Sequence, residues 1–356
     1  MSSDDAPVNA PTPSIDLVRL AAWMDEAGLP DAGAPLTAKV ISGGSQNEIF
    51  EIRRGDFHAA LRKPPATAAA GRDEGILREW RIIEALDGTD VPHTKAYAVC
   101  KDPTVLGGTF YLMGFVDGWS PMNHRDGWPE PFNSNVEDRR GLAFQLVEGV
   151  ARMGAVDWQG KGLSDLGKPE GFHDRQVDRW LAFYERVKTR EIDGMDVATQ
   201  WLRTHRPLDF VPGIMHGDYQ WANVMCKHGS PAGLAAIIDW EMGTIGDPKL
   251  DLGWVLQVWP DTPAEKVAMS YVDTRDMPTR DELVAHDVVE SGRSVRRHRL
   301  LRSAGPLEAR RGVGTGYAAA LKGIGDEKLL TFGETVSELM LRAANFAQSS
   351  SYPEAK

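Results

Sequence analysis

The chain lacks the features that mark disulfide-stabilised proteins, cysteine-ligated metal sites and membrane-spanning proteins. Its 356 residues include only two cysteines, Cys100 and Cys226, which can form neither a disulfide framework nor a site with paired cysteine ligands. No apolar run approaches the ~20 residues that a membrane helix needs. Residues 1–14 have neither a basic region nor an apolar core, so we expect a disordered tail there and no signal peptide.

The shortage of basic residues narrows the range of partners. The chain has 51 acidic and 40 basic residues and a formal net charge of −11. Nucleic-acid backbones attract basic surfaces, so we expect no nucleic-acid partner. An acidic chain suits a cationic substrate, but this charge is equally common among soluble cytoplasmic proteins. The sequence therefore predicts a cytoplasmic globular protein that binds no membrane, and it gives no indication of the oligomeric state.

The first third of the chain has the pattern of a small α+β unit. Ser14 is a suitable N-cap for a helix over 15–27, whose apolar residues share one face. Asp117-Gly118 ends the unit with a hinge signal. Between them, periodicity and turn residues predict three strands, a helix and two further strands, over 36–42, 48–53, 57–62, 74–86, 97–100 and 109–115.

Beyond the hinge the pattern becomes mainly helical, with a short β-rich stretch over 214–238. The predicted helices cover 135–156, 174–188, 197–204, a segment from Pro248 onward and 327–347. We therefore expect two lobes, over 15–116 and 117–349, with tails at 1–14 and 350–356.

The most informative stretch carries three oxygen-bearing side chains at short spacing. An Asp in a His-Gly-Asp turn, an Asn five residues later and an Asp that closes an apolar strand stand at Asp218, Asn223 and Asp239. Phosphoryl transfer requires such a set: a carboxylate to orient and deprotonate the attacking hydroxyl, and oxygen ligands for Mg²⁺. Each piece alone could be no more than a polar turn or a helix cap. Together, in this order and spacing, they indicate phosphoryl transfer.

This pattern resembles the aminoglycoside phosphotransferase and choline kinase superfamily. The likeness covers about residues 35 to 290 and implies a two-lobed protein-kinase-like fold of class α+β. The small β-rich N-terminal lobe would bind the nucleotide, and the larger, mainly helical C-terminal lobe would carry catalysis and the substrate. The stretches at 238–241 and 246–252 also match the superfamily. The likeness is closest to the branch that includes the kinase-like domain of acyl-CoA dehydrogenase family members 10 and 11, on stretches at 60–65, 156–158 and 175–180.

The resemblance implies an ATP-dependent reaction, with Mg²⁺, that moves the γ-phosphoryl group to a hydroxyl of a small molecule. By position, Asp218 matches the catalytic base, and Asn223 and Asp239 match the magnesium ligands. His216 matches a structural histidine that supports the catalytic loop and does not itself act as acid or base.

Nucleotide-binding residues of the N-terminal lobe follow from the same likeness. The adenine-binding segment of the family matches the backbone from Met113 to Val116, in which we expect Met113 and Phe115 to contact adenine. A core strand has the same composition. A second match is a Gly-rich turn, which in the family covers the ATP phosphates. Backbone N–H groups of such a turn can bind anions, although an ordinary hairpin turn has the same composition. The turn consists of Ser42, Gly43, Gly44, Ser45, Gln46 and Asn47.

The phosphate-binding cation of the family is a lysine, and here Arg62 stands at that position with Lys63 beside it. Adjacent strand residues face opposite ways, and the alternation around Leu61 favours Arg62. Arginine keeps the charge and can bind phosphate with two N–H groups. Glu79 is the candidate for the pairing carboxylate, and a solvated helix face accounts for this residue equally well.

Outside the catalytic motif, Asp247 and an arginine-rich segment have local interpretations. Asp247 before Pro248 is a good helix start, so we expect structural roles for Asp247 and Asp251. The segment 291–315 contains seven arginines and no lysine, and it breaks the helical period. A frame-shifted stretch and a divergent basic loop both account for that segment, and the second would offer a site for an anionic substrate such as a CoA ester.

These residues do not identify the small molecule that accepts the phosphoryl group. The branch suggests a hydroxyacyl-CoA-like metabolite, which we favour, while the superfamily suggests an aminoglycoside-like polycation. A nucleotide-binding module with little or no catalysis is the alternative from another functional class. Arg62 in place of lysine and the irregular 291–315 segment motivate that alternative. The presence of the Asp, the Asn and the metal Asp argues against it.

Overall fold

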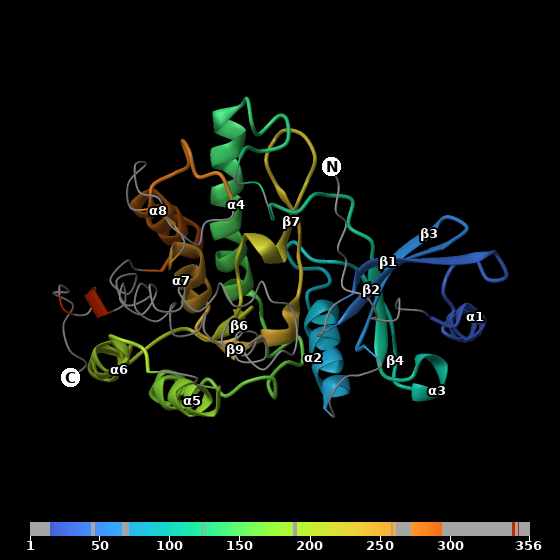
Figure 1. Ribbon diagram of the computed structural model, residues 1–356, viewed down its shortest axis with the longest axis horizontal. Coiled ribbons are helices and arrows are strands. Elements are labelled where there is room, and N and C mark those ends of the chain that lie inside the picture. Colours follow the sequence, from blue (N-terminus) through green and yellow to red (C-terminus); the bar gives the residue numbers. More distant parts are fainter. Residues whose placement is uncertain are drawn as a thin grey trace, which may run out of the picture. The chain divides into compact units, whose positions relative to one another are not determined.

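The computed structural model describes residues 15–43, 47–65, 71–122, 124, 126–187, 191–257, 259–260, 272–293, 344–345 and 348, and the following statements concern these residues. The chain forms two compact units (Figure 1). Unit 1 consists of Met1–Glu84 and Thr94–Phe115, and unit 2 consists of Ala85–His93 and Val116–Lys356. Within the described part, no helix combines the length and the apolar character needed to cross a bilayer.

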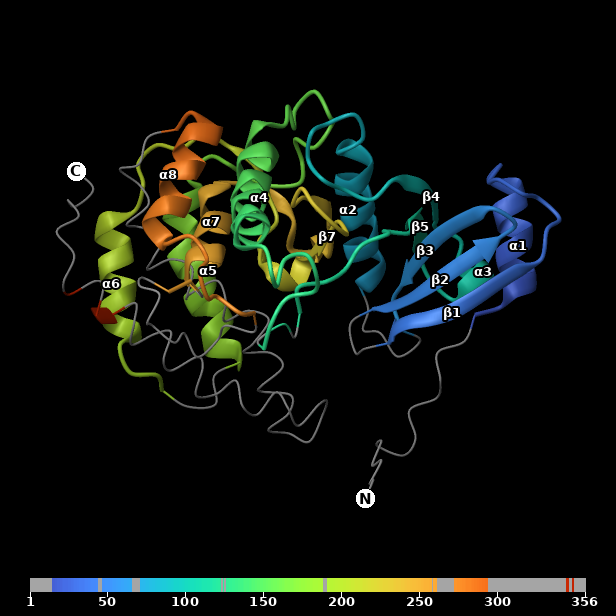
Figure 2. The ribbon, with the colours of Figure 1, turned by 90° about the horizontal axis from the view of Figure 1, so that it is seen from above.

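Unit 1 is a five-stranded antiparallel sheet with helices on both faces. The strand order is β1-β2-β3-β5-β4, so β5 inserts between β3 and β4 (Figure 2). Alternation along the strands directs apolar side chains to a core under α1 and α3, and polar ones such as Arg62 to the α2 side. The elements are α1 (Leu17–Glu26), β1 (Leu36–Gly43), β2 (Glu48–Arg54), β3 (Phe57–Lys63), α2 (Arg72–Ala85), β4 (Ala96–Cys100), α3 (Pro103–Leu106) and β5 (Phe110–Gly114).

Helix α1 begins two residues later than predicted. Its N-cap is Asp16, whose side chain accepts hydrogen bonds from Val18 N and Arg19 N, so the predicted capping role of Ser14 was wrong. Ser14 itself lies outside the described residues. The predicted apolar face is present, since Leu20 and Met24 are fully buried in the core of unit 1.

Unit 2 is built around the long helix α4, which contacts α7, α8, β6 and β8. Its strands form two small antiparallel pairs, β6 with β9 and β7 with β8, and the loops at their ends carry the residues of the predicted catalytic motif. The helices and strands are α4 (Val136–Ala155), α5 (Phe172–Val187), α6 (Met195–His205), β6 (Gly213–Met215), η1 (Trp221–Asn223), β7 (Val224–Cys226), β8 (Leu234–Ile237), η2 (Trp240–Met242), β9 (Thr244–Gly246), α7 (Lys249–Gln257) and α8 (Arg280–Ser291).

Helix α8 was not predicted as a separate element. A capping box starts it, because Thr279 accepts from Glu282 N while the Glu282 side chain accepts from Thr279 N. Gly292 follows its last residue with φ 62°, a left-handed conformation that ends helices. Nearly all of the predicted helix over 327–347 and of the segment 291–315 lies outside the described residues, and residues 344 and 345 of that helix are helical.

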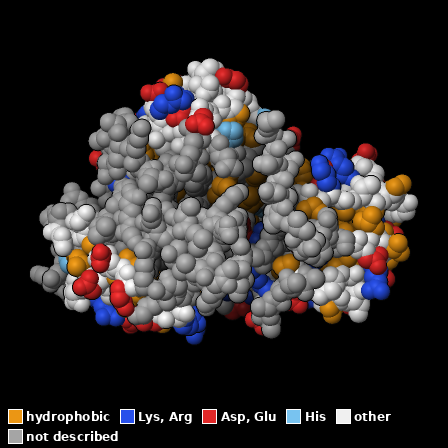
Figure 3. All heavy atoms as spheres, viewed as in Figure 1, with side chains coloured by type: hydrophobic (Ala, Val, Ile, Leu, Met, Phe, Trp, Pro, Cys, Tyr) orange, Lys and Arg blue, Asp and Glu red, His pale blue; other side chains and the backbone are white. Residues whose placement is uncertain are grey.

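Charges of both signs occur on the described part of the face that Figure 3 shows. Figure 3 shows acidic and basic side chains next to one another on the described part of one face. The net charge of −11 is therefore not gathered into one acidic patch on that part of the face.

Candidate active site

The loop after β6 is fixed by one buried carboxylate. Asp251 of α7 accepts a hydrogen bond from His216 N at 2.6 Å through Oδ2 and from Gly217 N at 2.8 Å through Oδ1. Gly217 has φ +81°, and a Cβ there would lie 2.8 Å from Met242 O. Only glycine fits this close, left-handed position. The His-Gly-Asp sequence is therefore held by its backbone, which leaves the Asp218 side chain for other contacts.

His216 connects this loop to the segment after β8. Its Nε2 lies 2.8 Å from Ile238 O, and its Nδ1 lies 3.3 Å from Asp218 N. A carbonyl accepts and a backbone N–H donates, so the ring carries its proton on Nε2. Complete burial lowers the pKa of His216, which keeps the imidazole neutral in this tautomer. These contacts link the loop after β6 to the segment after β8, and the predicted supporting role of His216 in catalysis stays a prediction.

The carboxylate of Asp218 is held by two side-chain amides. Gln220 Nε2 donates to Oδ1 at 2.7 Å, and Asn223 Nδ2 donates to Oδ2 at 3.0 Å. Partial burial, together with the nearby charges of Asp239 and Glu241, raises the pKa of Asp218 to about 7 against the lowering by the two amides. A carboxyl group with a pKa near neutrality can accept and release a proton at cellular pH.

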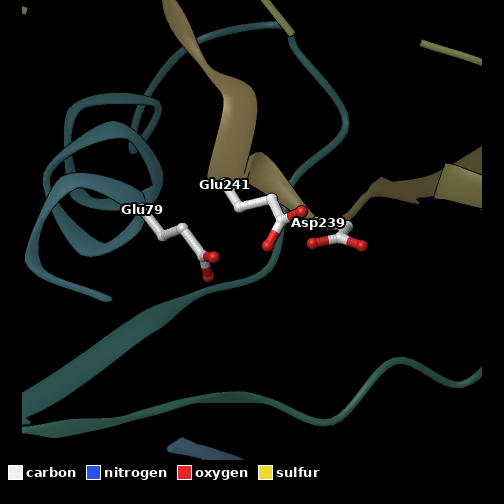
Figure 4. Close-up of side chains that lie close together, drawn as sticks. All are labelled: Glu79, Asp239 and Glu241. Atoms are coloured by element: carbon white, nitrogen blue, oxygen red, sulfur yellow. The ribbon is translucent and has the colours of Figure 1, made fainter. Parts of the chain in front are cut away.

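Asn223 and Asp239 have the donor atoms that Mg²⁺ prefers. Asn223 Nδ2 donates to Asp218 O at 2.7 Å as well as to Asp218 Oδ2, so its Oδ1 is the atom that a cation would contact. Asp239 follows β8 in the left-handed conformation, with φ 65° and ψ 59°. Such a conformation is costly for a non-glycine residue and is often retained at functional sites. Figure 4 shows the Asp239 carboxylate beside that of Glu241 from the same segment. This all-oxygen donor set fits Mg²⁺.

In unit 1, Arg62 and Lys63 point to different partners. Arg62 pairs with Glu79 of α2, with Nε to Oε2 at 2.8 Å and Nη2 to Oε1 at 3.1 Å. Lys63 pairs with Glu48 of β2 at 2.6 Å. Tyr111 Oη also donates to Glu79 at 2.8 Å, and Glu79 is buried. Of the two roles that the sequence allows, Glu79 therefore takes that of the pairing carboxylate and not that of a solvated helix face.

The structure describes only part of the predicted nucleotide contacts. Ser42 and Gly43 end β1, whereas Gly44, Ser45 and Gln46 lie outside the described residues. Asn47 precedes β2 and is buried. Met113 lies on β5, and the Phe115 ring stacks on His58 with centroids 4.0 Å apart. Their role in binding a nucleotide stays a prediction.

Asp247 has the local role expected from the sequence. Its Oδ1 accepts from Lys249 N at 3.1 Å at the start of α7, and its Oδ2 contacts His173 Nε2 at 2.9 Å. Both side chains of that contact are buried. Asp247 thus orients the beginning of the helix that carries Asp251.

Sequence reasoning missed Tyr219 as an anchor of the loop. This fully buried side chain donates through Oη to Leu146 O of α4 at 2.8 Å. The approach requires Gly149 on α4, because a Cβ there would lie 2.1 Å from Tyr219 Oη. Neither residue carries a sequence signal of its own, since a Tyr beside an Asp and a Gly inside a helical pattern are both common.

Comparison with known proteins identifies the family. Residues 37–284 match the model of the phosphotransferase enzyme family. The chain belongs to this family. This confirms the predicted resemblance, and the two units agree with the predicted α+β kinase-like fold.

Two curated relatives belong to the predicted branch. Acyl-CoA dehydrogenase family member 10 of Mus musculus is 30% identical over 220 residues, covering 62% of this chain and 20% of that protein. Family member 11 of Homo sapiens is 29% identical over 255 residues, covering 71% of this chain and 32% of that protein. This chain therefore corresponds to less than half of the length of either relative.

A solved structure from Ralstonia eutropha, a candidate aminoglycoside phosphotransferase, has a similar fold. Its TM-score is 0.79 at 26% identity, covering 96% of this chain and 100% of that one. The likeness thus extends over nearly the whole of both chains.

The close approach of Gly149 to Tyr219 generates a first prediction. Gly149→Ala should lower the free energy of unfolding by about 1–3 kcal/mol, because the new methyl group forces Tyr219 and its loop to move. Adding Tyr219→Phe should recover part of this loss, since the phenolic oxygen is the nearest clashing atom. Urea denaturation of the single and double variants measures both effects.

Gly75 provides the matched control, because it lies in α2 and a Cβ added to it would meet no atom within 4 Å. Gly75→Ala should stabilise the protein by about 0.5–1 kcal/mol through helix propensity. Equal effects of the Gly75 and Gly149 substitutions would contradict the assigned contact.

Asp251 generates a prediction on pH dependence. Burial raises its pKa from 3.8 to about 7, against the lowering by the two backbone N–H donors. The folded chain then binds this proton more tightly than the unfolded chain. The resulting stability is present below pH 3.8 and is lost as the pH rises through about 7. Without nucleotide and with EDTA, Asp251 should therefore make the free energy of unfolding larger at pH 5 than at pH 8, whereas His216, whose pKa burial lowers, acts in the opposite direction.

Asp251→Asn should reduce this difference, because the titrating group is gone. The remaining difference belongs to Asp218, whose pKa is also raised to about 7, and to His216, whose lowered pKa opposes it. An unchanged pH dependence in the variant would show that Asp251 titrates normally.

Proposed function

We propose that the chain transfers the γ-phosphoryl group of ATP to a hydroxyl of a small molecule, with Mg²⁺ as cofactor. One observation carries this proposal. Asp218 is half-buried and its pKa is raised, and its carboxylate is held by the amide of Asn223, whose remaining oxygen suits a cation. A base and a metal ligand fixed to each other in one short loop is what an in-line phosphoryl transfer requires.

In the proposed reaction Asp218 accepts a hydrogen bond from the acceptor hydroxyl and then its proton. The hydroxyl oxygen forms a bond to the γ-phosphorus, and the bond between that phosphorus and the β–γ bridging oxygen breaks. ADP leaves with the electron pair, and the proton stays on Asp218 until solvent removes it. The raised pKa of Asp218 makes the carboxylate a stronger base than an exposed aspartate.

Asn223 Oδ1 and the Asp239 carboxylate would hold the magnesium ion. When bound, Mg²⁺ supplies neutralisation of the charge that develops on the transferring phosphates. Asp239 is pre-set for this role by its left-handed backbone after β8. Glu241 is close enough to Asp239 to add negative charge that attracts the cation (Figure 4).

Unit 1 would supply the groups that bind the nucleotide. Arg62 would contact the phosphates, and its ion pair with Glu79 fixes the guanidinium. The turn from Ser42 to Asn47 would cover the phosphates with backbone N–H groups. Backbone at Met113 and Phe115 would contact adenine. The buried Arg62–Glu79 pair makes a non-catalytic module less attractive, because the substitution of arginine for lysine leaves the ion pair intact.

For the acceptor we favour a hydroxyacyl-CoA-like metabolite. The two curated relatives are named for acyl-CoA dehydrogenation, and each has a much longer chain that includes a match to this one. A protein that phosphorylates a hydroxyacyl-CoA would act on a compound of related chemistry. An aminoglycoside-like acceptor is the second candidate, supported by the description of the Ralstonia eutropha structure.

The test is incubation of the purified protein with Mg·ATP and a cell metabolite extract, followed by mass spectrometry for phosphate-shifted products. We expect a product with the intact protein and a loss of several orders of magnitude in rate with Asp218→Ala, because the base is removed. The fold should persist, since Asp218 is held by side chains of its own loop.

Asp209→Ala is the matched control, an exposed aspartate before β6 that should leave the rate unchanged. Product formation by Asp218→Ala at the wild-type rate would overturn the assignment of the base. A wild-type protein that binds ATP but forms no product would favour the non-catalytic module.

A further inference from the structure

The amide of Gln220 lies directly on the carboxylate that the proposed function makes the base. We propose that Gln220 is a positioning residue, which fixes the orientation of the Asp218 carboxylate toward the acceptor hydroxyl. This inference rests on the proposed function and adds to it a residue outside the Asp, Asn and metal Asp of the motif. It assigns Gln220 no contact with substrate.

The contacts of Asp218 support this role. Its two carboxylate oxygens each receive one amide N–H, Oδ1 from Gln220 at 2.7 Å and Oδ2 from Asn223 at 3.0 Å. A single donor would leave the carboxylate able to rotate about its Cβ–Cγ bond. Two donors on different oxygens fix that rotation. Hydrogen bonds to a charged acceptor are also stronger than neutral ones, so each donor contributes substantially.

The backbone of Gln220 supports the same role. Gln220 is the N-cap of the short turn η1, with φ −159° and ψ 173°, and its carbonyl accepts from Asn223 N at 2.9 Å. Its side chain makes no capping hydrogen bond, although Ser, Thr, Asp or Asn would be the usual choice there. The side chain instead reaches back to Asp218. One residue therefore holds both Asp218, through its side chain, and Asn223, through its carbonyl.

Loss of the carboxylate orientation should slow the chemical step and leave nucleotide binding unaffected. An oriented carboxylate places its free lone pair where the hydroxyl arrives, and misalignment of a reacting group is costly in rate. Binding of ATP does not depend on that orientation. Loss of the Gln220 amide should therefore lower kcat and leave the KM for ATP and the affinity for ATP nearly unchanged.

The experiment compares the wild-type protein with Gln220→Met and Gln220→Glu. Methionine keeps the approximate length without a donor, and glutamate keeps the shape but places a negative charge against Asp218. The probe is γ-labelled Mg·ATP with a fixed metabolite extract as acceptor, varied in ATP to separate kcat from KM. ATP affinity and the free energy of unfolding are measured for each variant. Gln200→Met on α6, an exposed glutamine, is the matched control.

We expect kcat to fall about tenfold to a hundredfold in Gln220→Met, the loss that follows from a missing hydrogen bond to a charged group. Gln220→Glu should be slower still, because the like charge displaces the Asp218 carboxylate. The control should match the wild type. A merely structural role predicts instead that both variants lose stability and ATP affinity together with rate.

Failure of this inference differs from failure of the proposed function. If the wild type transfers phosphate and Gln220→Met retains kcat within about twofold, the positioning role is wrong and the kinase assignment stands. If the wild type transfers no phosphate to any compound in the extract, the proposed function is wrong, and the positioning role is wrong with it.

Discussion

The geometry of the candidate site depends on one buried carboxylate that holds backbone. Asp251 accepts the N–H groups of both His216 and Gly217, so the loop cannot shift without leaving a buried acceptor and two donors unpaired. Asp251 is in turn placed by α7, whose first turn is fixed by Asp247. The cost of this arrangement is a carboxylate shielded from water, which is why the pKa of Asp251 is raised to about 7.

In the candidate site, the amide side chains of Gln220 and Asn223 orient the carboxylate of Asp218. Asp218 is half-buried beside Asp239 and Glu241, and both the partial loss of water and these charges disfavour its ionised form. The N–H groups of Gln220 and Asn223 offset part of this cost and fix the carboxylate in one orientation. Amides suit this task because they donate without adding a positive charge, which would make the carboxylate a weaker base. In unit 1, the buried Arg62–Glu79 pair places a cation in a similarly fixed manner.

Much of the fold could be predicted from the sequence, because alternation and turn residues mark the strands of unit 1 clearly. The motif from His216 to Asp239 was predictable because its residue types and spacing together are rare. The Asp218–Gln220 contact, the Tyr219 anchor and the need for Gly149 were not, because they depend on distances between side chains that no local pattern encodes. The capping box that starts α8 has a sequence signal, since Glu282 stands three residues after Thr279.

The proposed function requires that the chain bind ATP together with a magnesium ion held by Asn223 and Asp239. Calorimetric titration of the protein with ATP, in Mg²⁺ and in EDTA, tests it most directly, with Asp239→Asn beside the wild type. The account predicts that Mg²⁺ strengthens wild-type ATP binding by about tenfold or more, and that Asp239→Asn removes this difference because one hard oxygen ligand is weakened. Equal affinity in Mg²⁺ and EDTA, or no ATP binding at all, would contradict it.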